Sequence, residues 1–283
     1  MIAARHGLML IAPLMLVLAA FFLLPVLMML PTSFREYAPG AGLVPGVWTL
    51  ENYTRIITDD YYREVIWRTL GLGLFVTLAC LLLGYPLAFL IARGPERWRV
   101  PLILLVIFPM MLNLVVRSFG WIALLANRGL VNNLLIQLGL IATPLKLMFN
   151  LTGLMIGLTH IYLPFMVLML VAAIRNVPRD VEAAAATLGS SRLHVFAAVT
   201  LPLSAPGILA GSILVFVLTI SALVTPRMLG GPTYKVMATL IYDEFMQLLD
   251  WPSGSALSFA LTAMAIGVIW LSSRLTRRWA GMA

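Results

Sequence analysis

Six long apolar segments constrain this chain more than any other feature of its sequence. A helix needs about 20 apolar residues to cross a bilayer, and each segment is about that long or longer. Only 11% of the 283 residues are Asp, Glu, Lys or Arg, against roughly 25% in soluble domains, which excludes an ordinary soluble enzyme. We therefore predict an all-α membrane protein with one transmembrane domain over residues 1–283. The six predicted spans cover residues 8–30, 69–92, 100–126, 147–174, 206–229 and 255–273.

The charged residues between these segments predict the orientation of the chain. The first segment is too long for a signal peptide and has no small-residue cleavage site before Pro31, so we predict that it is retained. With the N-terminus inside, the cytoplasmic segments hold ten basic and three acidic residues, and the outer segments hold eight of each. Short cytoplasmic loops are enriched in Lys and Arg. We predict that both termini are cytoplasmic and attribute the net charge of +8 to orientation, not to binding of nucleic acid.

The sequence lacks the common motifs of nucleotide, zinc and serine hydrolase sites. It contains no GxxxxGK[ST], HExxH or GxSxG, spacings on which those sites depend. No predicted span contains Asp or Glu, whereas proton-coupled carriers place ionisable residues at mid-membrane. We predict that the chain is not an enzyme, binds no metal or cofactor, and depends on another subunit for any uphill transport. An ion-coupled carrier and a non-transporting scaffold stay open as alternatives.

The connection between the fourth and fifth spans, residues 175–205, has a helical pattern of its own. Pro178 and the two acidic residues that follow it are typical of a helix N-terminus, and the alanines at 183–186 favour helix propagation. Gly189 is typical of the position after a helix end. One of the next two serines can cap a second helix, which we expect to end at Pro202. A short alanine-rich helix suits docking into a groove on a partner.

This connection resembles the EAA loop of permease subunits in binding-protein-dependent ABC importers. The family pattern is Glu-Ala-Ala, three residues, Gly, nine residues and Ile-x-Leu-Pro, and here nine residues separate Gly189 from Val199 at the Ile position. Ala183 stands where the family has Glu, and Glu182 lies one residue earlier, about 100° around a helix. The resemblance assigns coupling to an ATPase to Glu182, Ala184, Ala185, Gly189, Val199, Leu201 and Pro202.

Three further stretches resemble the spermidine/putrescine branch of this family. They are residues 50–55 (LENYTR), 77–88 (TLACLLLGYPLA) and 250–252 (DWP). The resemblance implies the membrane-translocating permease of a polyamine importer in a bacterial inner membrane. It also implies a second, paralogous permease, a periplasmic substrate-binding protein and two ATPase subunits that hold ATP and Mg. Import of another small organic solute, such as an amino-acid-like or phosphonate compound, stays open.

Two groups of polar residues are candidates for the substrate pathway. A linear polycation needs carboxylates and aromatic faces, and an acidic, aromatic stretch before the sixth span offers both. A solvated helix face or a contact for the binding protein is the alternative. Two residues in the third span share a helix face, although Arg117 could instead snorkel or pair with backbone carbonyls. The candidates are Asn113, Arg117, Tyr242, Asp243, Glu244 and Trp251.

Three further residue patterns predict packing inside the bundle. Gly153 with Gly157, and Gly207 with Gly211, are small residues four apart, a spacing that lets helices approach closely. They predict packing within this chain or against a partner chain. We predict that His160, in the middle of the fourth span, is a hydrogen-bonded core residue.

Overall fold

The chain is mostly helical, as its apolar segments predict, and it divides into two units. The structure is a computed structural model that describes residues 2–38 and 42–280. Unit 1 comprises Met1–Arg63 and Leu240–Ala260, and unit 2 comprises Glu64–Thr239 and Leu261–Ala283. Two long helices, α3 (Asp60–Arg93) and α13 (Trp251–Ala280), contribute to both units. The single domain over residues 1–283 stays a prediction.

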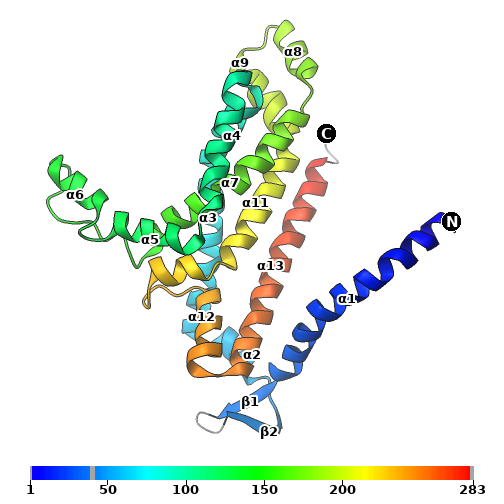
Figure 1. The fold of residues 1–283 in the computed structure, drawn as a ribbon, viewed down its shortest axis with the longest axis vertical. Helices are drawn as coiled ribbons and strands as arrows, with labels where there is room; N and C mark the ends of the chain where they lie inside the picture. Colours follow the sequence, from blue (N-terminus) through cyan, green and yellow to red (C-terminus); the bar gives the residue numbers. More distant parts are fainter. Residues whose placement is uncertain (1, 39–41, 281–283) are drawn as a thin grey trace. The chain divides into compact units, whose positions relative to one another are not determined.

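Helix α7 (Leu151–Asn176) is the most deeply buried candidate span of unit 2. Asn150 caps its N-terminus by accepting a hydrogen bond from the Gly153 amide at 3.0 Å, a strongly preferred use of Asn. The helix ends just before Pro178, because a proline disfavours helical backbone in the preceding residue. In Figure 1, α7 lies beside α4 (Glu96–Met111) and α11 (Ala205–Ile220), and both pack against it.

Glycines allow α7 and α11 to approach closely. A Cβ on Gly207 would collide with the Ala173 side chain, and one on Gly211 would lie 2.8 Å from the sulfur of Met166. Gly157 likewise faces Leu229, whose Cδ1 would lie 2.7 Å from an added Cβ. The glycine pairs therefore pack within this chain, one of the two outcomes that the sequence leaves open.

The third predicted span, 100–126, is two helices instead of one. Helix α4 ends at Met111, and α5 (Leu114–Leu125) begins after Asn113, whose side chain accepts a hydrogen bond from the Val115 amide at 2.8 Å. Asn at this position satisfies an amide that the start of a helix leaves free. Because this cap stabilises a new helix start just after Pro109, the apolar run is interrupted. Helix α6 (Leu130–Gln137) follows after a short turn.

The fifth predicted span, 206–229, also contains an interruption. Helix α11 ends at Ile220, and a π-helical turn, η2 (Pro226–Gly230), begins five residues after Ser221. The chain continues through α12 (Met237–Asp243) and the π-helical turn η3 (Glu244–Leu248) to α13. Short π-helical turns occur often at functional sites.

The helices meet the requirements of a multi-span membrane protein. By length and composition, the described residues contain five helices able to cross a membrane, or six when one bent pair is counted. This confirms the all-α membrane fold. The five are Ile11–Thr32, Asp60–Arg93, Leu114–Gln137, Leu151–Asn176 and Trp251–Arg274, and the bent pair is Arg192–Leu203 with Ala205–Ile220.

Unit 1 contains a β-hairpin that the sequence analysis does not predict. Helix α1 (Ile2–Thr32) leads into antiparallel strands β1 (Arg35–Ala38) and β2 (Gly42–Trp48), which α2 (Glu51–Thr58) follows. The Asn52 amide nitrogen donates to the carbonyl oxygens of Ser33 and Arg35, at 3.0 Å each. These bonds fix the hairpin to α2. The sequence signal is the turn-forming run PGAG at residues 39–42.

Candidate functional site

The 175–205 segment folds as a helix, a glycine turn and a second helix. Helix α8 (Arg179–Thr187) follows Pro178, and Gly189 has φ of +84°, a left-handed conformation that favours glycine. The Ser191 hydroxyl accepts a hydrogen bond from the His194 amide at 3.3 Å and caps α9 (Arg192–Val195). The predicted helix, turn and cap are therefore confirmed.

The second helix continues through η1 (Phe196–Thr200) and α10 (Leu201–Leu203). It ends at Leu203, one residue beyond the predicted end at Pro202. The chain bends by 62° before α11, at Ser204, whose hydroxyl lies 2.8 Å from the Tyr85 hydroxyl.

The tip of the 175–205 segment exposes apolar side chains. Within the described chain, α8 buries none of its residues. Leu188 and Leu193, which lie on either side of the Gly189 turn, are 88% and 77% exposed. Large apolar side chains that are this exposed and close together indicate an interaction surface. In Figure 1, α8 and α9 lie at the end of unit 2 where α3 gives way to α4.

A groove of about 530 Å³ lies beside this tip. Its aromatic floor is Phe196, which contacts Tyr85 and Phe89 edge to face, with ring centroids 5.6 and 5.4 Å apart. Apolar and polar side chains of α8 and α9 form its walls. The residues that line it include Phe89, Glu182, Ala186, Arg192, Phe196 and Thr200.

Glu182 points into unit 2, toward α3. Its Oε1 accepts hydrogen bonds from Arg93 Nε (3.2 Å), Arg93 Nη2 (3.0 Å) and the Thr200 hydroxyl (2.8 Å). Of the other residues assigned to coupling, Ala184, Leu201 and Pro202 are exposed and Ala185 and Val199 are half-buried. Sequence reasoning missed Arg93 and Thr200 as partners of Glu182. The available signal was that Glu182 stands one residue before the family's Glu position, which turns its side chain about 100° around the helix.

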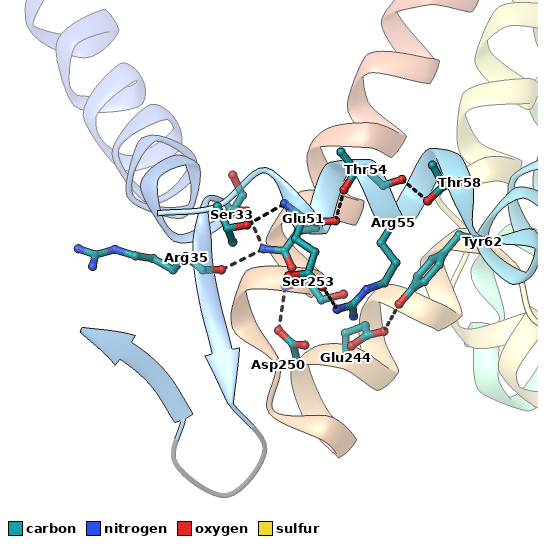
Figure 2. Close-up of polar contacts among 12 residues, drawn as sticks. Ser33, Arg35, Glu51, Thr54, Arg55, Thr58, Tyr62, Glu244, Asp250 and Ser253 are labelled. Carbon is teal, nitrogen blue, oxygen red and sulfur yellow. Dashed lines mark hydrogen bonds and ion pairs between the residues drawn. The ribbon is translucent and has the colours of Figure 1, made fainter. Parts of the chain in front are cut away.

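The acidic stretch before α13 forms part of a polar cluster inside unit 1 (Figure 2). Asp243 and Glu244 are only 8% and 5% exposed, so their side chains do not form an open acidic face. Glu244 accepts a hydrogen bond from the Tyr62 hydroxyl at 3.3 Å, and Figure 2 shows Arg55 extending toward it from α2. Among the aromatic candidates, Tyr242 lies one residue before Asp243 in α12, and Trp251 is half exposed and contacts Phe245 edge to face.

Burial changes the acidity of this cluster. Burial, and secondly the charge of Asp250, raise the pKa of the Glu244 carboxyl. Burial also raises the pKa of Asp250, although the Ser253 amide donates to its Oδ1 at 2.9 Å and opposes that change. The two carboxyls therefore hold protons more tightly than free side chains do.

The structure does not join Asn113 and Arg117 through their side chains. The Asn113 side chain caps α5, whereas Nε and Nη1 of Arg117 are buried and have no hydrogen-bond partner among the described residues. Nearby, the Trp121 indole donates to Nδ1 of His160 at 3.2 Å. His160 is therefore hydrogen-bonded, as predicted.

Comparisons with known proteins agree with this geometry. Residues 81–280 match the family model described as "binding-protein-dependent transport system inner membrane component". The spermidine/putrescine transport system permease protein PotB of Escherichia coli K12 is 38% identical over 264 residues, covering 92% of this chain and 95% of that protein. PotB of Haemophilus influenzae is 33% identical and covers 91% of each chain.

A solved structure shows the same fold. A bacterial ABC transporter that imports the acidic polysaccharide alginate has a chain with a TM-score of 0.76, at 18% identity, covering 97% of this chain and 96% of its own. The fold, the 175–205 segment and the matches over most of the chain agree. The chain belongs to the family of inner membrane components of binding-protein-dependent transport systems, and it is a multi-pass permease subunit of an ABC importer.

Proposed function

We propose that this permease imports polyamines such as spermidine and putrescine. The observation that carries the proposal is the 38% identity to the E. coli spermidine/putrescine permease over 92% of the chain. Identity of this extent includes the membrane-spanning helices that would line a substrate pathway as well as the 175–205 segment. The buried carboxyls of unit 1 and the half-exposed ring of Trp251 are groups that attract ammonium ions.

The proposed importer contains four kinds of subunit, of which this chain is one. Two ATPase subunits bind ATP and Mg and catalyse hydrolysis, a second and paralogous permease completes the pathway, and a periplasmic protein delivers substrate. This chain contributes no catalytic group. The exposed tip with Leu188 and Leu193 supports docking of an ATPase on the 175–205 segment, and that segment and both termini then lie in the cytoplasm.

In this mechanism the chain transmits movement between two surfaces. Closure of the ATPase pair displaces the 175–205 segment, and α11, which begins where that segment ends, follows it. A ligand shifts such a two-state equilibrium only through its different affinity for the two states. ATP acts through the ATPases at one surface of the permease, and the loaded binding protein acts at the other. Import therefore requires that both bind more tightly to the same state of the permease.

The test begins with purification of the tagged chain from the membranes of its native host in mild detergent. We expect a stoichiometric ATPase and a second permease by mass spectrometry of the co-purifying proteins. In proteoliposomes, the binding protein loaded with spermidine should stimulate ATP hydrolysis and drive accumulation of labelled spermidine. A homo-oligomer without an ATPase contradicts the importer, whereas an intact complex that spermidine leaves unstimulated contradicts only the substrate.

Import of a solute with an anionic group is the second candidate, and Arg117 favours it. Burying the donor groups of a cation without hydrogen-bond partners is costly, and Nε and Nη1 of the half-buried Arg117 have no such partner in the described chain. A carboxylate or phosphonate would satisfy both nitrogens, whereas a polycation would be repelled. The same proteoliposomes, supplied with an amino acid or a phosphonate and the cognate binding protein, distinguish the two substrates.

A further inference from the structure

We propose that Arg93 is a positioning residue that fastens α8 to the end of α3, so that displacement of α8 by the ATPase is passed directly into α3. The inference rests on the proposed coupling role of the 175–205 segment and adds to it. It gives Glu182 a partner inside the chain, and it adds α3 as a second route for the movement beside α11.

The contacts of Arg93 and Glu182 together join four elements. Its Nη2 donates to the carbonyl oxygen of Val177 (2.8 Å), directly after α7, and its Nε and Nη2 donate to Glu182 on α8. Thr200 of η1 donates to the same carboxylate oxygen. Oε1 of Glu182 therefore accepts three hydrogen bonds from two elements other than its own.

This ion pair is protected from solvent. The side chain of Arg93 is 12% exposed and that of Glu182 is 18% exposed. Screening by water and salt is weaker for such a pair than for an exposed one. If one partner is removed, the other is left as a charge that is mostly buried and unpaired, which strongly disfavours this arrangement.

One face of α3 is directed at the 175–205 segment. Tyr85, Phe89 and Arg93 lie four residues apart, so they share a helix face. Tyr85 lies within hydrogen-bond distance of Ser204, and both Tyr85 and Phe89 contact the ring of Phe196. The segment is thus attached to α3 at both of its ends, beside Ser204 and beside α8.

The Arg93 contact is the polar link between α8 and α3. Helix α8 buries no residue within the described chain, so packing alone holds it weakly. Without Arg93, α8 would keep its exposed docking surface but could move independently of α3. The predicted defect is therefore a loss of coupling with the ATPase still bound, which differs from the loss of a docking residue.

The experiment uses the whole reconstituted importer with Arg93→Gln, Glu182→Gln and the double variant. In all three variants we expect the stimulation by loaded binding protein to fall about tenfold, within the usual range of coupling between sites. Arg93→Gln should leave co-purification of the ATPase and basal hydrolysis unchanged. The double variant should be no worse than either single variant, because all three break the same contact. Arg97→Gln, at the exposed start of α4, is the matched control.

Two conservative variants keep the test decisive if Arg93→Gln does not fold. Arg93→Lys retains a cation that can reach one acceptor but lacks the fork of Arg, so it should restore part of the stimulation. Thr200→Val removes only one hydroxyl donor and should reduce stimulation less than Arg93→Gln.

Three results would overturn the role of Arg93. They are normal stimulation in Arg93→Gln, additive defects in the double variant, and loss of the ATPase from Glu182→Gln alone. The last result would make Glu182 a docking residue. If the unmodified complex itself shows no stimulation, the proposed function fails, and that outcome is separate from these three.

Discussion

Gly189 is a residue whose backbone conformation limits what can replace it. Its φ is +84°, and no described atom lies within 4 Å of an added Cβ, so conformation and not space sets the cost. An L-residue in a left-handed conformation costs roughly 1–2 kcal/mol, and a β-branched side chain makes it worse. We expect Gly189→Val to abolish stimulation of ATP hydrolysis by loaded binding protein while the spans still fold.

Gly189→Asn is the control, because Asn tolerates the left-handed conformation better than other residues with a side chain. The asparagine variant should retain most of the stimulation. Normal stimulation in a correctly inserted Gly189→Val complex would show that the turn is not needed for coupling.

Glu244 predicts that the stability of the folded chain depends on pH. Its folded-state pKa is raised by burial and then by Asp250, so the folded state holds its proton more tightly than the unfolded state. Stability is therefore highest below the ordinary pKa of Glu and falls as pH rises through the raised value. Glu244→Gln mimics the protonated form and can still accept the hydrogen bond from Tyr62.

We expect Glu244→Gln to raise the melting temperature at pH 8 by a few degrees, since about 1 kcal/mol shifts a domain of this size by roughly 2–4 °C. The difference should shrink as the pH is lowered from 8 into the acidic range, because the native carboxyl takes up its proton there. Thermal unfolding of the detergent-purified protein across this range measures it. An equal or lower melting temperature at pH 8 would contradict the cost of burying the charge.

At the scale of elements, the contact between α7 and α11 depends on the absence of a side chain at one position. A Cβ at Gly207 would collide with Ala173. Overpacking of this kind costs roughly 1–3 kcal/mol, so Gly207→Ala should lower the melting temperature by several degrees. Adding Ala173→Gly removes the opposing methyl group and should restore it.

Gly267→Ala in α13 is the matched control, because no described atom lies within 4 Å of the added Cβ. It should leave the melting temperature unchanged or raise it slightly, since alanine favours a helix. If Ala173→Gly gives no rescue, the two helices do not meet at this pair.

The elements that the sequence predicts well are those determined by local pattern. The apolar runs predict the helices. The residues around Gly189 predict the turn, because capping and left-handed backbone depend on neighbours in the chain. The interruption at Asn113 was missed, because a capping residue inside an apolar run acts only when the helix before it also ends. Burial of Asp243 and Glu244, and the pairing of Glu182 with Arg93, depend on contacts between residues far apart in sequence, which one sequence does not reveal.

At the scale of the whole molecule, the topology prediction concerns which face of the membrane carries the 175–205 segment. Under the predicted orientation, basic residues number ten inside and eight outside. The proposed function requires this segment on the ATP side. The β-hairpin of unit 1 belongs to the first loop and, with a single span before it, should lie on the opposite side.

A thiol-labelling experiment measures this topology directly. Cys80 is the single cysteine of the sequence and is fully buried, so the native chain provides a background of low reactivity. We expect a membrane-impermeant maleimide to label Ser190→Cys in inside-out vesicles but not in intact spheroplasts, and to label Glu36→Cys, exposed on β1, in the reverse pattern. Labelling of Ser190→Cys in intact spheroplasts would reverse the predicted orientation, because the reagent reaches only the outer face. Labelling of both variants from one side would require that an even number of spans separates residues 36 and 190 instead of the predicted three.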